Sequence, residues 1–467
     1  MANDARPFPL SAARGLGLTA LLALSGGLLH GQETAIVSLK DTLKTEVQER
    51  TFTLTRDMKV HVYAKGGGVQ HELLFAYGWI LDAATREVVW QMDGRTAKAE
   101  GDFLVGDQYL DLKAGTYEAY YSNHAFGWEL GHAHGTWSID RRELGAGRDP
   151  KRRGGHGILN ALKAELPGGT DDWAARAPYF GMEIYAKPSE AKEVATFSGP
   201  LGWRNEVLTL LATEDGGEWR SAFRLSRSVT FQVCCQGERD SEGSLMDTGW
   251  ILDARTHQKV WEMDDAAAAY AGGARKNRRL VQTLTLPVGE YLAGYTTDDS
   301  HSPAHWNAAP PCDPLRYGLI LAVAKDADRV VFTAVPEREP GTVLAALVRI
   351  GNDRQEAAAF TLPAAGTVRV YALGEADGRE MADGAWITDA SGAKVWEMAV
   401  EATSHAGGHK KNRMVDQIVT LPAGTYTVHY RSDGSHAYGD WNAAPPRDQE
   451  HYGVTVYAPE GRARAAK

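Results

Sequence analysis

The chain alternates apolar and polar residues over many short segments. In one of them Val368, Val370 and Ala372 fall on one side of an extended chain, whereas Arg369 and Tyr371 fall on the other side. This period of two is typical of a β-strand with one buried face. Turn signals such as Pro-Ala-Gly and Ala-Ser-Gly separate the segments at short intervals, and no long helical period intervenes. The pattern therefore predicts an all-β fold of antiparallel sheets packed in pairs.

Three copies of one sequence unit fill most of the chain. The stretch GWILDAATREVVWQM at 78–92 recurs as GWILDARTHQKVWEM at 249–263 and as AWITDASGAKVWEM at 385–398. Each copy follows an alternating segment and precedes a second hairpin segment, such as TLTLPVGEYLAGY at 283–295. Self-similarity of this kind indicates one structural unit repeated in tandem. We therefore predict three antiparallel, jelly-roll-like β-sandwich repeats over 36–186, 206–324 and 343–458, with connectors near 187–205 and 325–342.

Length and charge narrow the classes of function. A chain of 467 residues is long enough for about three domains of about 150 residues each. Its 50 Lys and Arg residues against 60 Asp and Glu residues give a net charge of −10. This balance offers no basic surface for phosphates, so we expect no nucleic-acid partner.

The N-terminal residues 1–31 have a different composition from the rest of the chain. Arg6 and Arg14 precede a run without charge that extends from Gly15 to Gln32, just before Glu33. This layout is typical of a signal peptide, and the alternative is a retained N-terminal membrane segment. Either interpretation predicts an exported protein, periplasmic or at the cell surface and associated with a membrane.

A loop is written twice, 135 positions apart. SHSPAHWNAAPP occupies 300–311 and SHAYGDWNAAPP occupies 435–446. The two copies share Lys-Asn-Arg at 276–278 and 411–413, and also these pairs: Asp298 and Asp433, His301 and His436, Trp306 and Trp441, Asn307 and Asn442. Such polar groups suit either a metal or ligand site or a loop that a buried Trp holds in place. The first unit lacks WNAAPP, so we favour the structural interpretation and predict that these residues anchor the loop.

The first unit instead carries an insertion at 127–171. Its histidines His132 and His134, with His124 nearby, are weak candidates for a transition-metal site. Ile158, Leu162 and Leu166 are spaced as on one face of a short helix. The insertion also concentrates basic residues, which suit docking to an acidic partner or to lipid headgroups; they are Arg141, Arg142, Arg148, Lys151, Arg152 and Arg153.

The framework of each unit resembles the prepeptidase C-terminal modules of secreted bacterial peptidases. The resemblance rests on an apolar strand, a hairpin such as DASG at 389–392 and a following segment such as LPAGTYTV at 421–428. It implies an accessory, non-catalytic module of an exported protein, which in some cases binds a calcium ion. No peptidase domain accompanies the modules here, so no protease function carries over. The WNAAPP loop is not part of the family pattern.

Chemistry-bearing motifs are scarce. The sequence has no G-x-S-x-G elbow, no H-E-x-x-H helix, no phosphate loop and no dinucleotide fingerprint, so we expect no enzyme. Of its three cysteines, Cys312 could bridge to Cys234 or Cys235 in an oxidising compartment, or all three could stay reduced.

Two non-catalytic functions remain open. The first is a scaffold, a membrane-extrinsic subunit that holds integral or membrane-associated proteins of a complex. The alternative is a glycan-binding or adhesion protein of the cell envelope. Glycan binding would need exposed aromatic side chains, but Trp79, Trp250 and Trp386 lie in alternating strands, where we expect burial. We therefore favour the scaffold.

Overall fold

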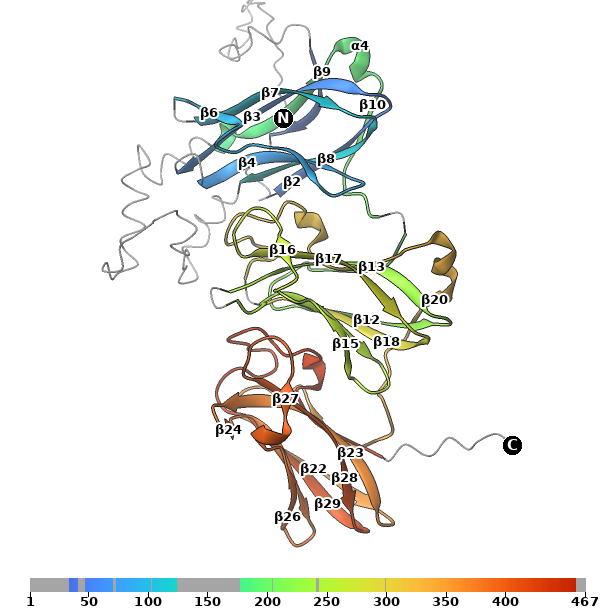
Figure 1. Ribbon diagram of the computed structural model, residues 1–467. Helices are drawn as coiled ribbons and strands as arrows, with labels where there is room; N and C mark the ends of the chain where they lie inside the picture. The colour runs from blue at the N-terminus through green and yellow to red at the C-terminus, as the bar shows by residue number, and fades with distance from the viewer. Residues whose placement is uncertain are drawn as a thin grey trace, which may run out of the picture.

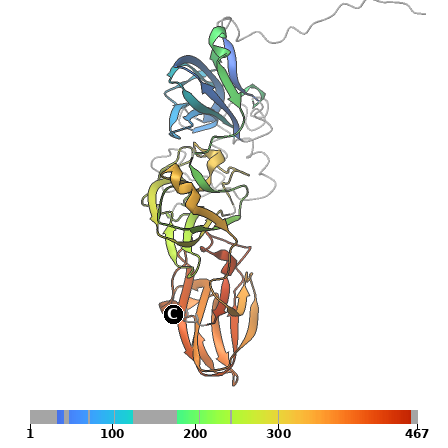
Figure 2. The same ribbon diagram turned by 90° about the vertical axis from the view of Figure 1, so that its right-hand side faces the viewer.

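The protein consists of three β-bodies stacked end to end (Figures 1 and 2). The computed structural model describes residues 33–40, 47–69, 73–101, 103–123, 177–203, 205–240, 243–298 and 300–458. Strands dominate these ranges, and the strands of every sheet pair antiparallel. The predicted all-β class is confirmed. The insertion at 127–171, with its expected helix, lies outside the described residues.

The first unit contains β1 to β10. Their bounds are Thr34–Leu39, Val47–Leu54, Met58–Val69, Leu73–Asp82, Val88–Gln91, Ala97–Glu100, Phe103–Leu112, Gly115–Asn123, Gly181–Ala186 and Val194–Phe197. A 3-10 turn at Ala177–Tyr179 precedes β9, and the short helix α4 at Pro188–Ala191 precedes β10. The strands form one layer in the order β1-β9-β3-β7-β6 and a second layer in the order β5-β4-β8-β2-β10. The two layers join where the end of β3 pairs with β4.

The second unit contains β11 to β20. Their bounds are Glu206–Leu211, Glu218–Leu225, Val229–Glu238, Thr248–Asp253, Lys259–Glu262, Ala269–Tyr270, Asn277–Leu286, Gly289–Thr296, Gly318–Val323 and Phe332–Val335. Short 3-10 segments at Pro314–Arg316 and Asp326–Val331 flank β19. The first sheet has the order β11-β19-β13-β17-β16 and the second sheet the order β15-β14-β18-β12-β20.

The third unit contains β21 to β30. Their bounds are Val343–Val348, Gln355–Leu362, Gly366–Asp377, Glu380–Met381, Gly384–Asp389, Lys394–Glu397, Ser404–His405, Asn412–Leu421, Gly424–Arg431 and Gly453–Tyr457. Two 3-10 turns lie at Val400–Ala402 and Gln449–His451. The first sheet has the order β21-β30-β23-β28-β27, with β24 paired to β23, and the second sheet has the order β22-β29-β25-β26.

Each unit buries its core between its two sheets. Val368, Val370 and Ala372 of β23 are fully buried, as their alternation predicts. Tyr371 lies on the opposite face of the same strand and is also buried, at 2% exposure. A half-buried strand does not account for that burial, so something outside the third sandwich must cover Tyr371.

Both connectors contribute structure to the unit that they leave. The connector at 187–205 contains α4 and β10, and β10 pairs with the edge strand β2. The connector at 325–342 contains a 3-10 segment and β20, which pairs with β12. In each case an added edge strand widens the second sheet before the chain enters the next unit, so only a few residues lie between the last strand of one unit and the first strand of the next.

The second sheet of one unit faces the first sheet of the next unit. In Figure 1, β4, β8 and β2 lie on the side of the first unit that faces β13, β16 and β17 of the second. At the next junction Arg369 of β23 donates to the carbonyl oxygen of Thr256, beside the tip of the β14–β15 hairpin. This stacking covers Tyr371 and explains its burial.

Candidate functional site

The repeated loop is built around its tryptophan. Trp306 is 2% exposed and meets the rings of His301 and Tyr317 edge-on, with centroids 4.9 and 5.3 Å away. Trp441 makes the same two contacts in the third unit but is only half-buried. Aromatic packing of this kind fixes the position of the loop on its own sandwich.

An asparagine of the Lys-Asn-Arg motif holds the backbone of the same loop. Nδ2 of Asn412 donates to the carbonyl oxygens of Gly407 and Ala444 at 2.8 and 2.9 Å. Its Oδ1 accepts from Nε2 of His436 at 2.6 Å. Burial, followed by the charge of Lys411, lowers the pKa of His436 to about 3, so this histidine is neutral. Asn277 and His301 make the same bonds in the second unit, so neither histidine presents its Nε2 to a ligand.

A lysine bridges the loop to a buried acidic group. Nζ of Lys276 lies 3.1 Å from Glu238 and 2.5 Å from Oδ1 of Asn307. In the third unit Nζ of Lys411 contacts Glu375 at 2.9 Å and Asn442 at 2.5 Å. The ammonium group supplies the positive charge that the carboxylate needs.

Three carboxylates of the third unit lie within metal-binding distance of one another: Glu375, Asp383 and Asp433. Asp383 already accepts from the backbone N–H of Asp433 at 2.7 Å and from the hydroxyl of Tyr452 at 2.6 Å. Burial raises the pKa of Asp383 to about 6. Calcium needs six to eight oxygen ligands, and the internal bonds leave this group poorly suited to supply them.

The residues that follow each WNAAPP loop reach into the preceding unit. Arg86 lies at the tip of the β4–β5 hairpin with a φ of 60°. Its Nε donates to Oδ2 of Asp313 at 2.9 Å, and its Nη groups donate to Glu118 at 2.6 and 2.8 Å. Nε1 of Trp79 donates to the carbonyl oxygen of Cys312 at 2.7 Å. All these charged groups are buried, so they form a junction rather than an exposed surface pair.

The second junction uses the same positions with different chemistry. His257 has a φ of 55° and occupies in its hairpin the position of Arg86. Its Nδ1 lies 2.8 Å from Oδ2 of Asp448, the residue equivalent to Asp313. Asp448 also accepts from Arg220 at 2.8 Å and contacts Nδ1 of His451 at 2.9 Å. Burial opposes charge on both partners, yet Asp448 raises the pKa of His451 to about 10.

The electrostatics of this junction favour an ion pair over a metal site. His257, Asp448 and His451 place ligand atoms within 4.8 Å of one another. Burial opposes ionisation of Asp448, but the facing histidines hold its pKa well below the usual range. Arg220 brings a fixed positive charge to the same carboxylate, and Tyr371 donates to it at 3.0 Å. A metal cation would have to displace these donors.

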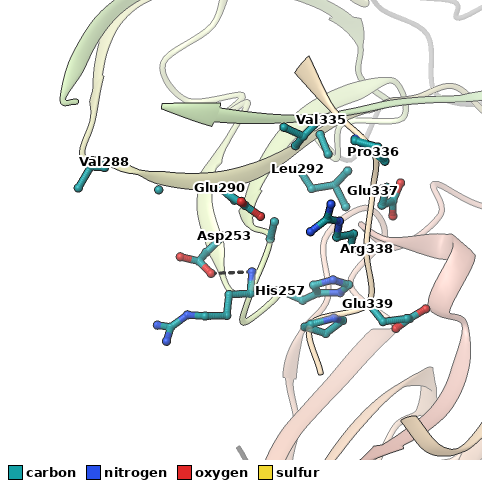
Figure 3. A pocket seen from close by; sticks show the side chains of 15 residues that line it. Asp253, His257, Val288, Glu290, Leu292, Val335, Pro336, Glu337, Arg338 and Glu339 are labelled. Carbon is teal, nitrogen blue, oxygen red and sulfur yellow. Dashed lines mark hydrogen bonds between the residues drawn. The ribbon is translucent and has the colours of Figure 1, made fainter. Parts of the chain in front are cut away.

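A pocket of about 460 Å³ lies beside this junction (Figure 3). Asp253, His257 and Glu290 line it from two hairpins of the second unit, and Arg338 and Glu339 line it from the connector. Its lining includes acidic and basic side chains and contains no Ser, Cys or Lys.

The duplicated loop is thus associated with the two junctions. The loop occurs in the two units that follow another sandwich, and in both the aspartate after Pro-Pro binds the preceding hairpin. The sequence pattern did not point to these four junction residues: Arg86, His257, Asp313 and Asp448. The repetition of the aspartate was visible in the alignment of the two loops, but its partner lies in a different unit.

Several predicted site residues lie outside the described residues. They are the candidate metal ligands His124, His132 and His134 and the basic group Arg141, Arg142, Arg148, Lys151, Arg152 and Arg153. The three cysteines are described, and all are unpaired. The bridge from Cys312 to Cys234 or Cys235 is therefore absent from this structure. Among the described residues, no helix has the length and apolar character needed to cross a bilayer.

Comparison with known proteins does not supply a family. No family model matches the chain, and no curated protein matches it. A structure of the CBM32-1, CBM32-2 and M60 catalytic domains of ZmpB from Clostridium perfringens aligns over 88% of this chain and 52% of that chain. The identity is 10% and the TM-score is 0.15, so this alignment is no evidence for a shared fold or function. This chain spans about half the length of that one. The resemblance to prepeptidase C-terminal modules stays a prediction.

Proposed function

We propose that the protein is a non-catalytic structural protein of the cell envelope, a stiff scaffold that holds membrane-associated partner proteins. The observation that supports this proposal most directly is the pair of buried junctions. Arg86 binds Asp313 across the first, and His257 binds Asp448 across the second. Three sandwiches that interlock in this way act as one elongated body.

The buried ion pairs at the junctions oppose bending of one unit relative to the next. Domains of one chain normally move relative to each other unless their interface is large or tightly bonded. Opening the first junction would separate Arg86 from Asp313, both of which are nearly inaccessible to solvent. Removing one partner of a buried pair leaves an uncompensated charge, which is strongly unfavourable. A stiff body of this kind can fix the distance between partners bound to different units.

We infer that the membrane side of the scaffold lies at the first unit. The uncharged run that begins at Gly15 and the basic insertion at 141–153 both belong to the N-terminal part of the chain. An apolar segment and a basic segment together favour attachment to an anionic membrane surface or to a complex embedded in it. On this proposal, units 2 and 3 project from that surface.

Purification from native membranes tests the proposal. The tagged full-length chain, expressed at its natural level, should co-purify with integral membrane proteins in fixed stoichiometry. Neutralising the basic residues of 141–153 should abolish the association. A control that neutralises the exposed Arg95, Lys98 and Lys113 should retain it. A chain that leaves the membrane as a free monomer, with no partner, would contradict the scaffold function.

A further inference from the structure

The outward face of the second sheet of unit 3 is a candidate binding surface. In units 1 and 2 the equivalent face packs against the following unit. Trp79 and Trp250 lie there and are 1% and 0% exposed. Trp386 occupies the same position in the third unit but is only half-buried, and the described residues include no further sandwich beyond it. The prediction that all three tryptophans are buried is therefore wrong for Trp386.

The third unit has also lost the groups that make a junction. Leu252 and Leu292, which are 1% exposed in unit 2, correspond to Thr388 and Thr427, which are half-buried. The β25–β26 hairpin is one residue shorter than its two counterparts, and Gly392 supplies the positive φ there. It therefore has no Arg or His to bind an aspartate of another unit. A second copy docked end to end would lack the pairing seen at both internal junctions.

What remains on this face is an aromatic pair among small side chains. Trp386 and His429 are direct cross-strand neighbours, and their rings stack with centroids 5.0 Å apart and planes 8° apart. The hydroxyl of Thr388 lies 3.1 Å from Nε2 of His429, which fixes the imidazole. Ala357 continues the same row on β22 and is exposed. Trp386 and His429 are therefore the large side chains in this row, and their neighbours carry only methyl and hydroxyl groups.

The face carries little net charge. Arg431 lies at one end of β29, and Glu397 lies beside Trp386 on the edge strand β26. Glu397 is paired with Lys394 at 2.7 Å. Charged ligands are held by several protein groups of opposite charge that converge on them. Among its described residues, this face has no such group of positive charges for a phosphate and no such group of negative charges for a cation.

We propose that this face binds a neutral carbohydrate through Trp386 and His429. A pyranose ring presents C–H groups on its flat side and hydroxyls around its edge, so it can lie on an aromatic ring while its hydroxyls bond to neighbouring polar groups. Trp386 provides the ring, and Thr388 and Thr427 provide hydroxyl groups that both donate and accept. A protein partner would call for an apolar centre, but the leucines that form one in unit 2 are replaced here.

The test uses the full-length chain and a panel of neutral oligosaccharides: cellohexaose, xylohexaose, mannohexaose and galactohexaose. Binding is measured by calorimetry at 0.1 and 0.5 M NaCl. We expect at least one of them to bind with an affinity that salt leaves unchanged, because no ion pair takes part. Trp386→Ala should raise Kd about tenfold or more, which matches the loss of one aromatic stacking contact. His429→Ala should weaken binding less.

Ile418→Ala serves as the matched control. Ile418 is 63% exposed on the first sheet of the same unit, so its removal should leave Kd unchanged. Thermal denaturation of each variant checks that Trp386→Ala still folds. Absence of binding to the whole panel, or binding that Trp386→Ala leaves intact, would overturn the proposal. A concentration-dependent dimer that this substitution abolishes would assign the face to a second copy instead. None of these results bears on co-purification with membrane proteins, so the scaffold function is tested separately.

Discussion

Nε of Arg86 lies 2.9 Å from Oδ2 of Asp313, although the two residues are 227 positions apart in the chain. Glu118 binds the other side of the same guanidinium group. His257 and Asp448 repeat the relationship at the next junction. A single pair of positions therefore joins all three units, with arginine at one junction and histidine at the other. The two junctions therefore differ in chemistry, and at the second junction His451 also contacts Asp448.

Replacing Arg86 by Met should destabilise the first junction. The substitution keeps much of the side-chain volume but leaves Glu118 and Asp313 buried without their cation. We expect a loss of about 3–5 kcal/mol in the free energy of unfolding, measured by urea denaturation followed by tryptophan fluorescence. Arg95→Met is the control, because Arg95 is 90% exposed and its ion pair should contribute at most about 0.5 kcal/mol. Equal stability of the two variants would show that the buried pair does not hold the junction.

The second junction should weaken as the pH rises. Asp448 raises the pKa of His451 from 6.5 to about 10, so the folded state holds this proton more tightly than the unfolded state. The stabilisation is complete below pH 6.5 and is lost as the pH rises through 10. The melting temperature of the third unit should therefore fall between pH 7 and pH 10.

The variant His451→Gln separates this effect from general alkaline denaturation. It removes the titrating group, so its melting temperature should change less over the same pH range. The first junction provides an internal comparison, because an arginine remains charged throughout. A wild-type profile that matches the profile of the variant would rule out His451 as the cause.

The loop tryptophans should support stability without any metal. Trp306→Ala should cost about 3–5 kcal/mol, because Trp306 is 2% exposed. Trp441 is half-buried, so Trp441→Ala should cost less. Lys276 and Lys411 already neutralise the nearby carboxylates, and addition of EDTA should leave the melting temperature unchanged. A clear drop in melting temperature with EDTA, restored by calcium, would instead indicate an ion site in the loop.

The three cysteines should all be free thiols. Cys234 and Cys235 are buried, and burial raises the pKa of Cys312 to about 12. Thiolate is the reactive form, so a thiol reagent at pH 8 should react slowly with the native protein. After denaturation without a reductant, the same reagent should titrate three thiols per chain. A count of one would establish a disulfide that the structure lacks.

The sequence alone determined the local architecture. The period-two alternation around Val370 predicted a strand with Val368, Val370 and Ala372 on its core face, and these three residues are buried, although Tyr371 on the other face is buried too. The recurring hairpin at 78–92, 249–263 and 385–398 predicted equivalent strand pairs, which the structure contains as β4–β5, β14–β15 and β25–β26. These features follow from interactions between residues that are close in the chain or opposite each other in one sheet. Alternation records which face of a strand turns away from water.

How the units meet follows from contacts between units that the sequence pattern does not contain. Trp79, Trp250 and Trp386 occupy the same position of three similar sequences, yet the first two are buried and the third is half-buried. Likewise, the aspartate after Pro-Pro is visible in the sequence, but its partner is not. The burial of a side chain depends on every surface that covers it, including the surface of a neighbouring unit. That surface comes from residues more than a hundred positions away, so the local hydrophobic pattern does not predict it.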